Sequence, residues 1–295
     1  MNRLQDLHVL VLGLGVSGLA MARWCAGQGA RVTVADTRAA PPQLPALHEQ
    51  LPDVHFIAGP LDAALLDDAS LRAVYRSPGL APAAIGGVVQ VARERGLPVA
   101  GELDLFTAAL QDLHAERGYA PRVIAVTGTN GKTTVTALTG QLVARAGLSV
   151  AAAGNIGPSL LDTLAQCLAD DALPQAWVLE LSSFQLDAAS DFEPTVATVL
   201  NVTQDHLDWH GDMAAYAAAK ARIFGQQATM VLNRDDPLVM AMQPQPPAKG
   251  AKGPRPAPRP APRRVVTFGA GLPQAPGDFG IEVVGGMAWL VRAQE

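Results

Sequence analysis

Residues 8–18 read HVLVLGLGVSG, a short apolar run followed directly by the pattern Gly-x-Gly-x-x-Gly. A helical stretch and a second apolar run, Arg31–Ala35, come next, and Asp36 follows that run. A strand, a glycine-rich turn, a helix and a strand in this order predict a βαβ unit, which belongs to a parallel sheet covered by helices. The glycines let the backbone turn tightly and bring its amides, with the helix N-terminus, against a diphosphate.

Three interpretations of this turn remain open. NAD(P) is the usual ligand of such a motif. The motif itself indicates only a diphosphate next to a ribose, however, and a UDP-sugar offers both groups. A tight connection between strand and helix without any ligand is the third interpretation.

A second glycine-rich loop, GTNGKTT at residues 128–134, lies between the apolar run Arg122–Thr127 and an amphipathic helical stretch, Thr133–Ala146. In such a loop the backbone amides surround phosphates, the lysine reaches the β and γ oxygens, and the next hydroxyl holds Mg²⁺. The standard pattern begins with a glycine five residues before the glycine that precedes the lysine, and this chain has Val126 at that position. The strand–loop–helix context still predicts an ATP site, formed by Gly128, Thr129, Asn130, Gly131, Lys132, Thr133 and Thr134.

Each motif opens its own series of alternating strands and helices. We therefore expect an α/β protein with two tandem doubly wound parallel-sheet domains. Residues 1–98 are predicted to form a Rossmann-like domain and residues 99–295 a central P-loop domain, with Gly101–His114 as a linking helix. Residues 243–264 interrupt the second domain with a basic, Pro-rich insertion, interpreted as a solvated loop rather than as a motif for a protein partner or an anionic surface.

Composition excludes several classes of protein. The chain has 295 residues, of which 49% are hydrophobic and 17% charged, as in globular proteins. Its net charge of −5 argues against a nucleic-acid partner. Cys25 and Cys167 lie far apart without a CxxC pattern, which argues against zinc and disulfide scaffolds. The apolar stretch Leu7–Ala22 differs from a secretion signal in its spaced glycines and in its flanking residues. No apolar run reaches the roughly 20 residues of a membrane span. We expect a cytoplasmic protein.

Polar side chains follow two further apolar strands. Glu180 lies at the end of the run Trp177–Leu181, and a dense polar loop, residues 201–208, follows Val196–Leu200. Strand ends of this kind lie over the nucleotide crevice of an α/β sheet, where a carboxylate can coordinate Mg²⁺. Taken alone, His206 reads as a solvated loop histidine. Taken alone, Lys220 reads as part of the solvated surface of a helix over residues 212–224.

Several motifs occur here in one fixed order. They are GTNGKT, GNIG (154–157), ELSSFQL (180–186), NVTQDHLDWHG (201–211) and AYAAAKARIF (215–224). In this combination the sequence resembles the Mur ligase family of peptidoglycan synthesis. With GLGVSG (13–18), Asp36-Thr37-Arg38 and Ser77-Pro78-Gly79 it is most similar to the D-glutamate-adding branch. The resemblance covers nearly the whole chain outside the Pro-rich insertion.

The resemblance implies an ATP-dependent amide ligase. ATP would phosphorylate the terminal carboxylate of UDP-N-acetylmuramoyl-L-alanine, and the amino group of D-glutamate would attack the acyl phosphate. Lys132 would bind ATP and act in catalysis, Thr133 and Glu180 would hold one Mg²⁺, and His206 and Lys220 a second, with Lys220 as a carbamate. Carbamate oxygens suit Mg²⁺, whereas a histidine ligand runs against its oxygen preference, so the resemblance alone supports His206.

Substrate contacts are implied by the same resemblance. The muramoyl–alanine part would contact Asn155, Ser182 and Gln185. The uridine diphosphate end would contact Val16, Ser17, Thr37, Arg38, Ser77 and Gly79. All partners would be small molecules, and we expect a monomer.

The sequence departs from the family in one respect. Members continue with a His-Asn-x-x-Asn segment and a C-terminal domain that carries the amino-acid site, and neither precedes Glu295. We therefore expect a truncated chain that does not turn over alone. Three alternatives stay open. The first is an NAD(P)-dependent oxidoreductase, which would not need the second phosphate loop. The second is a sister ligase that adds another amino acid or extends folate, although the UDP-type domain argues against the folate branch, and the third is a module that binds a UDP-sugar without turnover.

Overall fold

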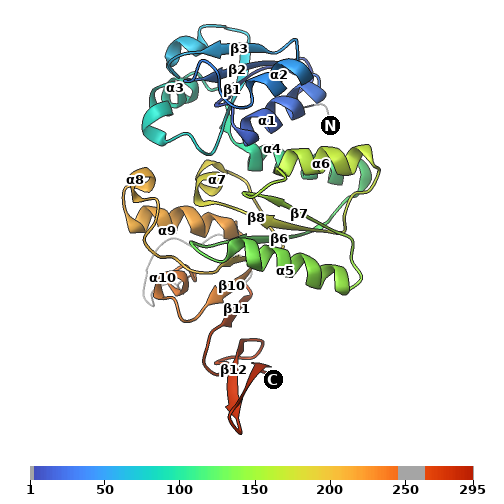
Figure 1. The fold of residues 1–295 in the computed structure, drawn as a ribbon, viewed down its shortest axis with the longest axis vertical. Helices are drawn as coiled ribbons and strands as arrows, with labels where there is room; N and C mark the ends of the chain where they lie inside the picture. The colour runs from blue at the N-terminus through green and yellow to red at the C-terminus, as the bar shows by residue number, and fades with distance from the viewer. Residues whose placement is uncertain (1–2, 245–262, 295) are drawn as a thin grey trace, which may run out of the picture.

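The computed structural model describes residues 3–244 and 263–294 of the chain. Two α/β domains follow one another along the long axis of the molecule, and a β-hairpin extends from the second (Figure 1). Residues 245–262 of the expected Pro-rich insertion lie outside the described residues. The predicted fold class, two tandem α/β domains with parallel sheets, is confirmed.

The first domain contains a five-stranded sheet whose neighbouring strands are all parallel, in the order β3-β2-β1-β4-β5. The strands are β1 (His8–Leu12), β2 (Arg31–Asp36), β3 (His55–Ala58), β4 (Leu71–Arg76) and β5 (Val99–Ala100). The helices are α1 (Val16–Gly27), α2 (Leu44–Gln50), the 3₁₀ turn η1 (Ala63–Leu66) and α3 (Pro82–Glu94). Because β5 pairs with β4, this sheet extends past residue 98, to Ala100.

The second domain contains an eight-stranded sheet in the order β13-β12-β11-β10-β9-β6-β8-β7, parallel except for the last pair, β12 and β13. The strands are β6 (Arg122–Thr127), β7 (Val150–Gly154), β8 (Ala176–Glu180), β9 (Val196–Val199), β10 (Thr229–Asn233), β11 (Val265–Phe268), β12 (Phe279–Val284) and β13 (Met287–Arg292). The helices are α5 (Lys132–Arg145), α6 (Leu160–Ala169), α7 (Ser183–Ala188), α8 (Leu207–His210), α9 (Met213–Ala221), the 3₁₀ turn η2 (Arg222–Phe224) and α10 (Pro237–Met240).

The linking helix, α4 (Glu102–Arg117), runs between the domains, and one hydrophobic core passes from the first sheet through α1, α4 and α6 into the second domain. Figure 1 shows these three helices where the domains join. An ion pair crosses the same junction, because Nε and Nη2 of Arg23 on α1 donate to the carboxylate of Asp162 on α6, at 3.0 and 2.7 Å. The domains therefore share a packed interface.

Three details differ from the expectations. The helix expected to reach Phe224 ends as an α-helix at Ala221 and continues as a 3₁₀ turn. Strand β12 was not predicted, and it forms a hairpin with β13 through Gly285 and Gly286, both with positive φ. The apolar face expected on α5 is largely solvent-exposed at Leu138 and Leu142, although the helix packs against β6, β7 and β8. A cavity of about 380 Å³ beside it is lined by residues of α5, β6, β9 and β10.

Candidate functional site

The loop at residues 128–134 has the backbone shape of a phosphate cradle. Gly128 has φ +159°, and a Cβ there would lie 3.0 Å from the Cβ of Leu200. Asn201 holds the loop from the neighbouring strand end, since its side-chain oxygen accepts from the Asn130 N–H at 2.8 Å and its carbonyl accepts from the Thr129 N–H at 3.0 Å. The path of the loop is therefore fixed by contacts other than a ligand.

Positive charge gathers at this loop. The Lys132 ammonium donates to the carbonyls of Gly128 and Thr129, both at 3.0 Å, and the Lys220 ammonium donates to the same Gly128 carbonyl at 2.9 Å. Helix α5 begins at Lys132 with no acidic residue and no side-chain cap, so its first N–H groups and helix dipole favour an anion. Thr133 and Thr134 lie exposed on the first turn of the same helix. The loop thus fits a chain of phosphates.

Lys220 corrects one interpretation made from the sequence alone. Its side chain is 1% exposed rather than solvated, and its ammonium lies 4.5 Å from the centre of the Tyr216 ring. Burial, and secondarily the charge of Lys132, lowers the pKa of Lys220 to about 7. A large part of this amine is therefore uncharged near neutral pH.

His206 lies next to the same aromatic ring, that of Tyr216. It has φ +51° and a half-exposed side chain, and its backbone N–H donates to the carboxylate of Asp205 at 2.9 Å. Its ring lies 4.8 Å from the Phe184 ring and 6.3 Å from the Tyr216 ring. The structure thus brings His206 and Lys220 into one cluster around the Tyr216 ring, although neither residue, taken alone, indicated a functional site.

Sequence reasoning missed the rest of this cluster. His210 donates to or accepts from the Ser183 hydroxyl at 2.9 Å, stacks on Phe184 and lies 5.1 Å from Tyr216. Burial lowers the pKa of His210. The density of aromatic and histidine side chains at residues 206–216 was the available signal.

Glu180 and Asn155 are brought together by strand pairing. Gly154 at the end of β7 pairs with Glu180 at the end of β8, and the amide nitrogen of the Asn155 side chain donates to the Glu180 carboxylate at 3.2 Å. A Cβ on Gly154 would lie 2.1 Å from the Glu180 carbonyl oxygen, so the close approach requires glycine. Glu180 is 3% exposed, which makes its carboxylate an inward-facing group at the carboxyl edge of the sheet.

Ser182 and Gln185 form the N-terminal cap of α7. The Ser182 hydroxyl accepts from the Gln185 N–H at 3.2 Å, and the Gln185 side-chain oxygen accepts from the Ser182 N–H at 3.0 Å. This reciprocal pair satisfies two donors at the start of the helix. Both side chains therefore have a structural role in addition to any contact with a substrate.

At the first glycine-rich turn, the carboxylate of Asp36 is hydrogen-bonded by neighbouring groups of the same chain. It is 2% exposed, and its carboxylate accepts from the Leu14 N–H at 2.7 Å and from Arg38 through the backbone N–H, Nε and Nη2 at 2.8–2.9 Å. The hydrogen bonds from Arg38, helped by that from Leu14, lower the pKa of Asp36 to about 2.

The other residues predicted here lie around the same turn. The Ser77 hydroxyl donates to the Gly13 carbonyl at 2.8 Å, and a Cβ on Gly18 would lie 1.9 Å from that carbonyl oxygen. Ser17 is half-buried, whereas the predicted contacts that face solvent are Val16, Thr37, Arg38 and Gly79.

The fit to Mg²⁺ depends on unusual ligands. Among the described residues, no three His, Cys, Asp or Glu side chains lie close enough together to hold a metal ion. The sets predicted from the sequence each contain a threonine or a lysine instead. The hydroxyls of Thr127 and Thr136, which flank the phosphate loop, are buried without a hydrogen-bond partner in the described part of the chain. Two buried hydroxyl oxygens close to the loop in the sequence are thus left without a partner among the described residues.

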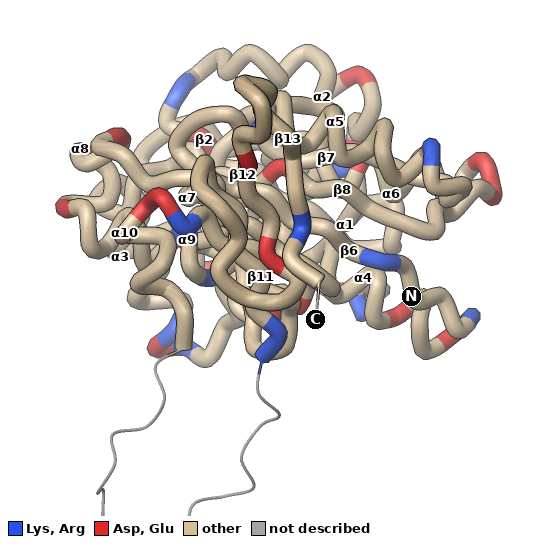
Figure 2. The backbone as a smooth tube through the Cα atoms, turned by 90° about the horizontal axis from the view of Figure 1, so that it is seen from below, with Lys and Arg blue, Asp and Glu red and all other residues tan. Residues whose placement is uncertain are grey.

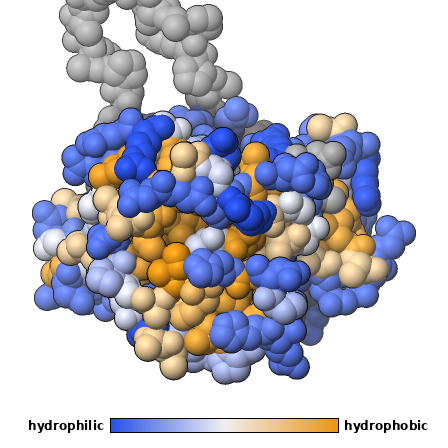
Figure 3. Space-filling model, turned by 90° about the horizontal axis from the view of Figure 1, so that it is seen from above, coloured by the Kyte–Doolittle hydropathy of each residue, from blue (hydrophilic) through white to orange (hydrophobic). Residues whose placement is uncertain are grey.

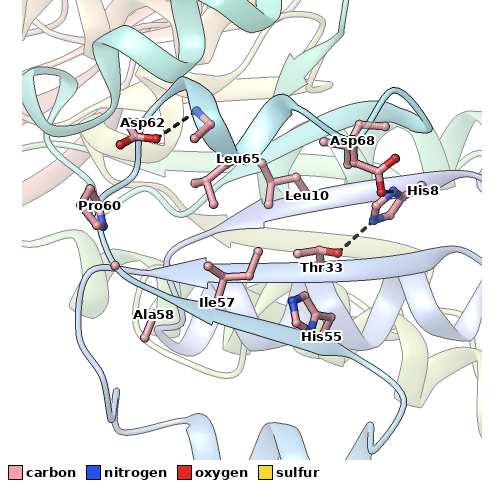
Figure 4. A pocket seen from close by; sticks show the side chains of 13 residues that line it. His8, Leu10, Thr33, His55, Ile57, Ala58, Pro60, Asp62, Leu65 and Asp68 are labelled. Atoms are coloured by element: carbon pink, nitrogen blue, oxygen red, sulfur yellow. Dashed lines mark hydrogen bonds and ion pairs between the residues drawn. The ribbon is translucent and has the colours of Figure 1, made fainter.

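A cavity of about 520 Å³ lies elsewhere (Figure 4). It covers the face of the first sheet at His8, Thr33 and Ile57, below the η1 segment, and contains no predicted site residue. The His8 ring is already hydrogen-bonded to Thr33 and Ser70 at 2.9 Å. Figure 3 shows hydrophobic side chains gathered over the middle of this end of the molecule.

In the view of Figure 2, basic and acidic residues are interspersed along the described part of the backbone. None of the described helices is long and apolar enough to cross a membrane.

Comparison with known proteins gives matches along most of the chain. The Mur ligase middle domain matches residues 126–252, and the N-terminal domain of MurD-like Mur ligases matches residues 7–101. UDP-N-acetylmuramoylalanine--D-glutamate ligase of Albidiferax ferrireducens is 62% identical over 100% of this chain and 57% of the relative. The protein of the same name from Polaromonas sp. is 50% identical over 100% of this chain and 64% of the relative.

The chain thus spans somewhat over half the length of these relatives. Among solved structures, MurF ligase from Thermotoga maritima, in complex with ADP, is 16% identical, with a TM-score of 0.44 over 99% of this chain and 56% of that one.

Proposed function

Because the chain belongs to the Mur ligase family, we propose that it provides the nucleotide-substrate and ATP sites of a ligase that joins D-glutamate to UDP-N-acetylmuramoyl-L-alanine. The observation that carries the proposal is the pair of lysines, Lys132 and Lys220, on one carbonyl of the second glycine-rich loop. Relatives of that name, 50% and 62% identical along the whole chain, support the choice of substrates.

ATP is assigned to the loop at residues 128–134. The amides at the start of α5 hold phosphate oxygens, and the Lys132 ammonium offsets the charge that develops on the transferred phosphoryl group. No acidic residue in the first turn of α5 opposes this binding. Consumption of ATP is consistent with a cytoplasmic enzyme.

Two Mg²⁺ ions complete the proposed site. Thr133 and Glu180 would hold one, and His206 with carbamylated Lys220 the other; when bound, the ions neutralise phosphate charge. Lys220 suits carbamylation because an uncharged amine attacks CO₂, and burial provides that form near neutral pH. The carbamate also replaces a partly protonated amine by an anion, which turns the repulsion between Lys220 and Lys132 into an attraction.

The first glycine-rich turn is assigned to uridine diphosphate rather than to NAD(P). A dinucleotide site usually offers the acidic residue after the second strand to a ribose hydroxyl. Here both oxygens of Asp36 are taken by Leu14 and Arg38. The exposed side chain of Thr37 and the Nη1 group of the half-exposed Arg38 are left to face a ligand, and a guanidinium N–H suits a diphosphate oxygen.

Calorimetric titration tests this assignment. We expect UDP-N-acetylmuramoyl-L-alanine to bind at least about tenfold more tightly than NAD⁺, and Arg38→Ala to weaken its binding about tenfold through the loss of a charged hydrogen bond. Arg31→Ala is the matched control, because Arg31 is an exposed arginine at the opposite end of β2. Tighter binding of NAD⁺ would refute the proposal.

A further inference from the structure

Glu102 is a buried carboxylate that the proposed reaction does not use. It is the first residue of α4 and only 3% exposed. Its carboxylate accepts from the Leu161 N–H at 3.2 Å and from the Leu160 N–H, which belong to the first turn of α6. It also accepts a hydrogen bond from the hydroxyl of Ser17, in the first turn of α1. Glu102 therefore joins the starts of three helices.

Two of these helices follow directly on loops of the proposed site. Helix α1 begins at the end of the diphosphate turn, residues 13–18, and α6 follows the loop at residues 154–158, which carries Asn155. A substrate that spans the two domains must contact both loops at once. Its affinity then depends on how well the separation of the loops matches its length, because any motion that must be suppressed on binding costs free energy.

We propose that Glu102 is a positioning residue that sets the separation of the diphosphate turn and the 154–158 loop, and so selects a substrate long enough to reach both. This inference rests on the proposed function for its substrate. A carboxylate suits the task because its two oxygens accept several N–H and O–H donors at once. Leaving those donors buried and unpaired is strongly unfavourable, so the arrangement is held firmly.

Neighbouring contacts support a role for Glu102 beyond simple packing. Arg23, farther along α1, pairs with Asp162 in the first turn of α6, and the hydroxyl of Ser159, the N-cap of α6, donates to Asp162 at 2.7 Å. These contacts hold the helices side by side. Glu102 alone, among the described residues, is hydrogen-bonded to the first turns of both α1 and α6 at the ends where the loops emerge.

The separation can be measured directly by electron–electron double resonance. Val16 and Ile156 lie on the two loops and are 58% and 57% exposed, so spin labels at Val16→Cys and Ile156→Cys report on the distance, with Cys25→Ala and Cys167→Ser removing the native thiols. We expect one narrow distance distribution in the parent protein. In Glu102→Leu we expect its width to increase about twofold, and in Glu102→Gln, which keeps an acceptor, to stay close to the parent value.

A matched control is Arg3→Gln. Arg3 pairs with Asp112 at 2.7 Å and so ties the N-terminal segment to α4, but near the opposite end of the helix. We expect the parent distribution in this variant. If Glu102→Leu does not fold, Ser17→Ala removes only the hydrogen bond to α1 and should broaden the distribution to a smaller extent. An unchanged distribution in the folded variant would overturn the inference.

Binding provides the second readout. UDP contacts only the first turn, whereas UDP-N-acetylmuramoyl-L-alanine reaches both loops. In the unlabelled protein, Glu102→Leu should therefore weaken binding of the full substrate about tenfold and leave binding of UDP unchanged; equal losses for both ligands would show a merely structural role. If the parent protein binds neither ligand, the proposed function fails, and the resonance measurement still decides the role of Glu102.

Discussion

The turn at residues 13–18 and the loop at residues 128–134 both join a buried parallel strand to the start of a helix, but different side chains surround them. An acidic group, Asp36, lies beneath the first and is saturated by Leu14 and Arg38. Two lysines share a carbonyl of the second. Glycine spacing therefore determines the backbone path, while side chains from distant segments decide which ligand charge each turn accepts.

The largest effect should come from removing charge at the second loop. Lys132→Ala should weaken binding of MgATP roughly 10- to 100-fold, because hydrogen bonds to charged groups contribute roughly 1.5–3 kcal/mol. Calorimetry measures the affinity, and circular dichroism checks the fold. Arg145→Ala, at the far end of the same helix, is the control and should bind like the parent. Parent-like affinity in Lys132→Ala would remove the contrast between the turns.

The first turn should be more sensitive to added volume. Gly18→Ala should lower the free energy of unfolding by roughly 1–3 kcal/mol, because the new methyl group would lie 1.9 Å from the Gly13 carbonyl oxygen. Gly140→Ala in α5 meets no atom within 4 Å and should raise it by up to about 1 kcal/mol. Urea denaturation measures both. Similar effects of the two substitutions would contradict the packing described for the turn.

The ion pair between Asp36 and Arg38 at the first turn should make the free energy of unfolding depend on pH in the acidic range. The folded pKa of Asp36, about 2, lies below its unfolded value of 3.8, so its contribution is present above about pH 4 and is lost as the pH falls through 4 to 2. Asp36→Asn should cost about 1–2 kcal/mol at pH 7, less than the shift alone implies because Arg38 is half-exposed. Thermal unfolding from pH 2 to 7 should show a shallower slope in the variant.

The smallest expected effect is the spectroscopic signal of carbamylated Lys220. In ¹³C-bicarbonate at pH 8, above the pKa of about 7, we expect a carbamate resonance in the parent protein. It should disappear in Lys220→Arg and persist in Lys132→Arg. A resonance that persists in Lys220→Arg would assign the carbamate to another amine. No resonance in the parent protein would argue against the proposed second Mg²⁺ set.

Local patterns predicted much of the fold because each alternating strand and helix carries its own signal. The strands His8–Leu12 and Arg122–Thr127 begin and end where the apolar runs do. The hairpin of β12 and β13 carries only a weak local signal, because its strands are largely exposed and lack a buried apolar run. The exposed apolar residues of α5 show the converse limit, since a helical pattern does not reveal which part of a sheet a helix covers.

The sequence by itself determined the two glycine-rich turns, the parallel α/β architecture and the polar strand ends, because each depends on residues close together in the chain. Only the tertiary structure decided the burial of Lys220 against Gly128, the saturation of Asp36 and the junction at Glu102. These depend on contacts between residues far apart in the chain, such as Lys220 with Gly128 and Glu102 with Leu161. Burial and hydrogen bonding, which set the charge of a side chain, arise only when such segments meet.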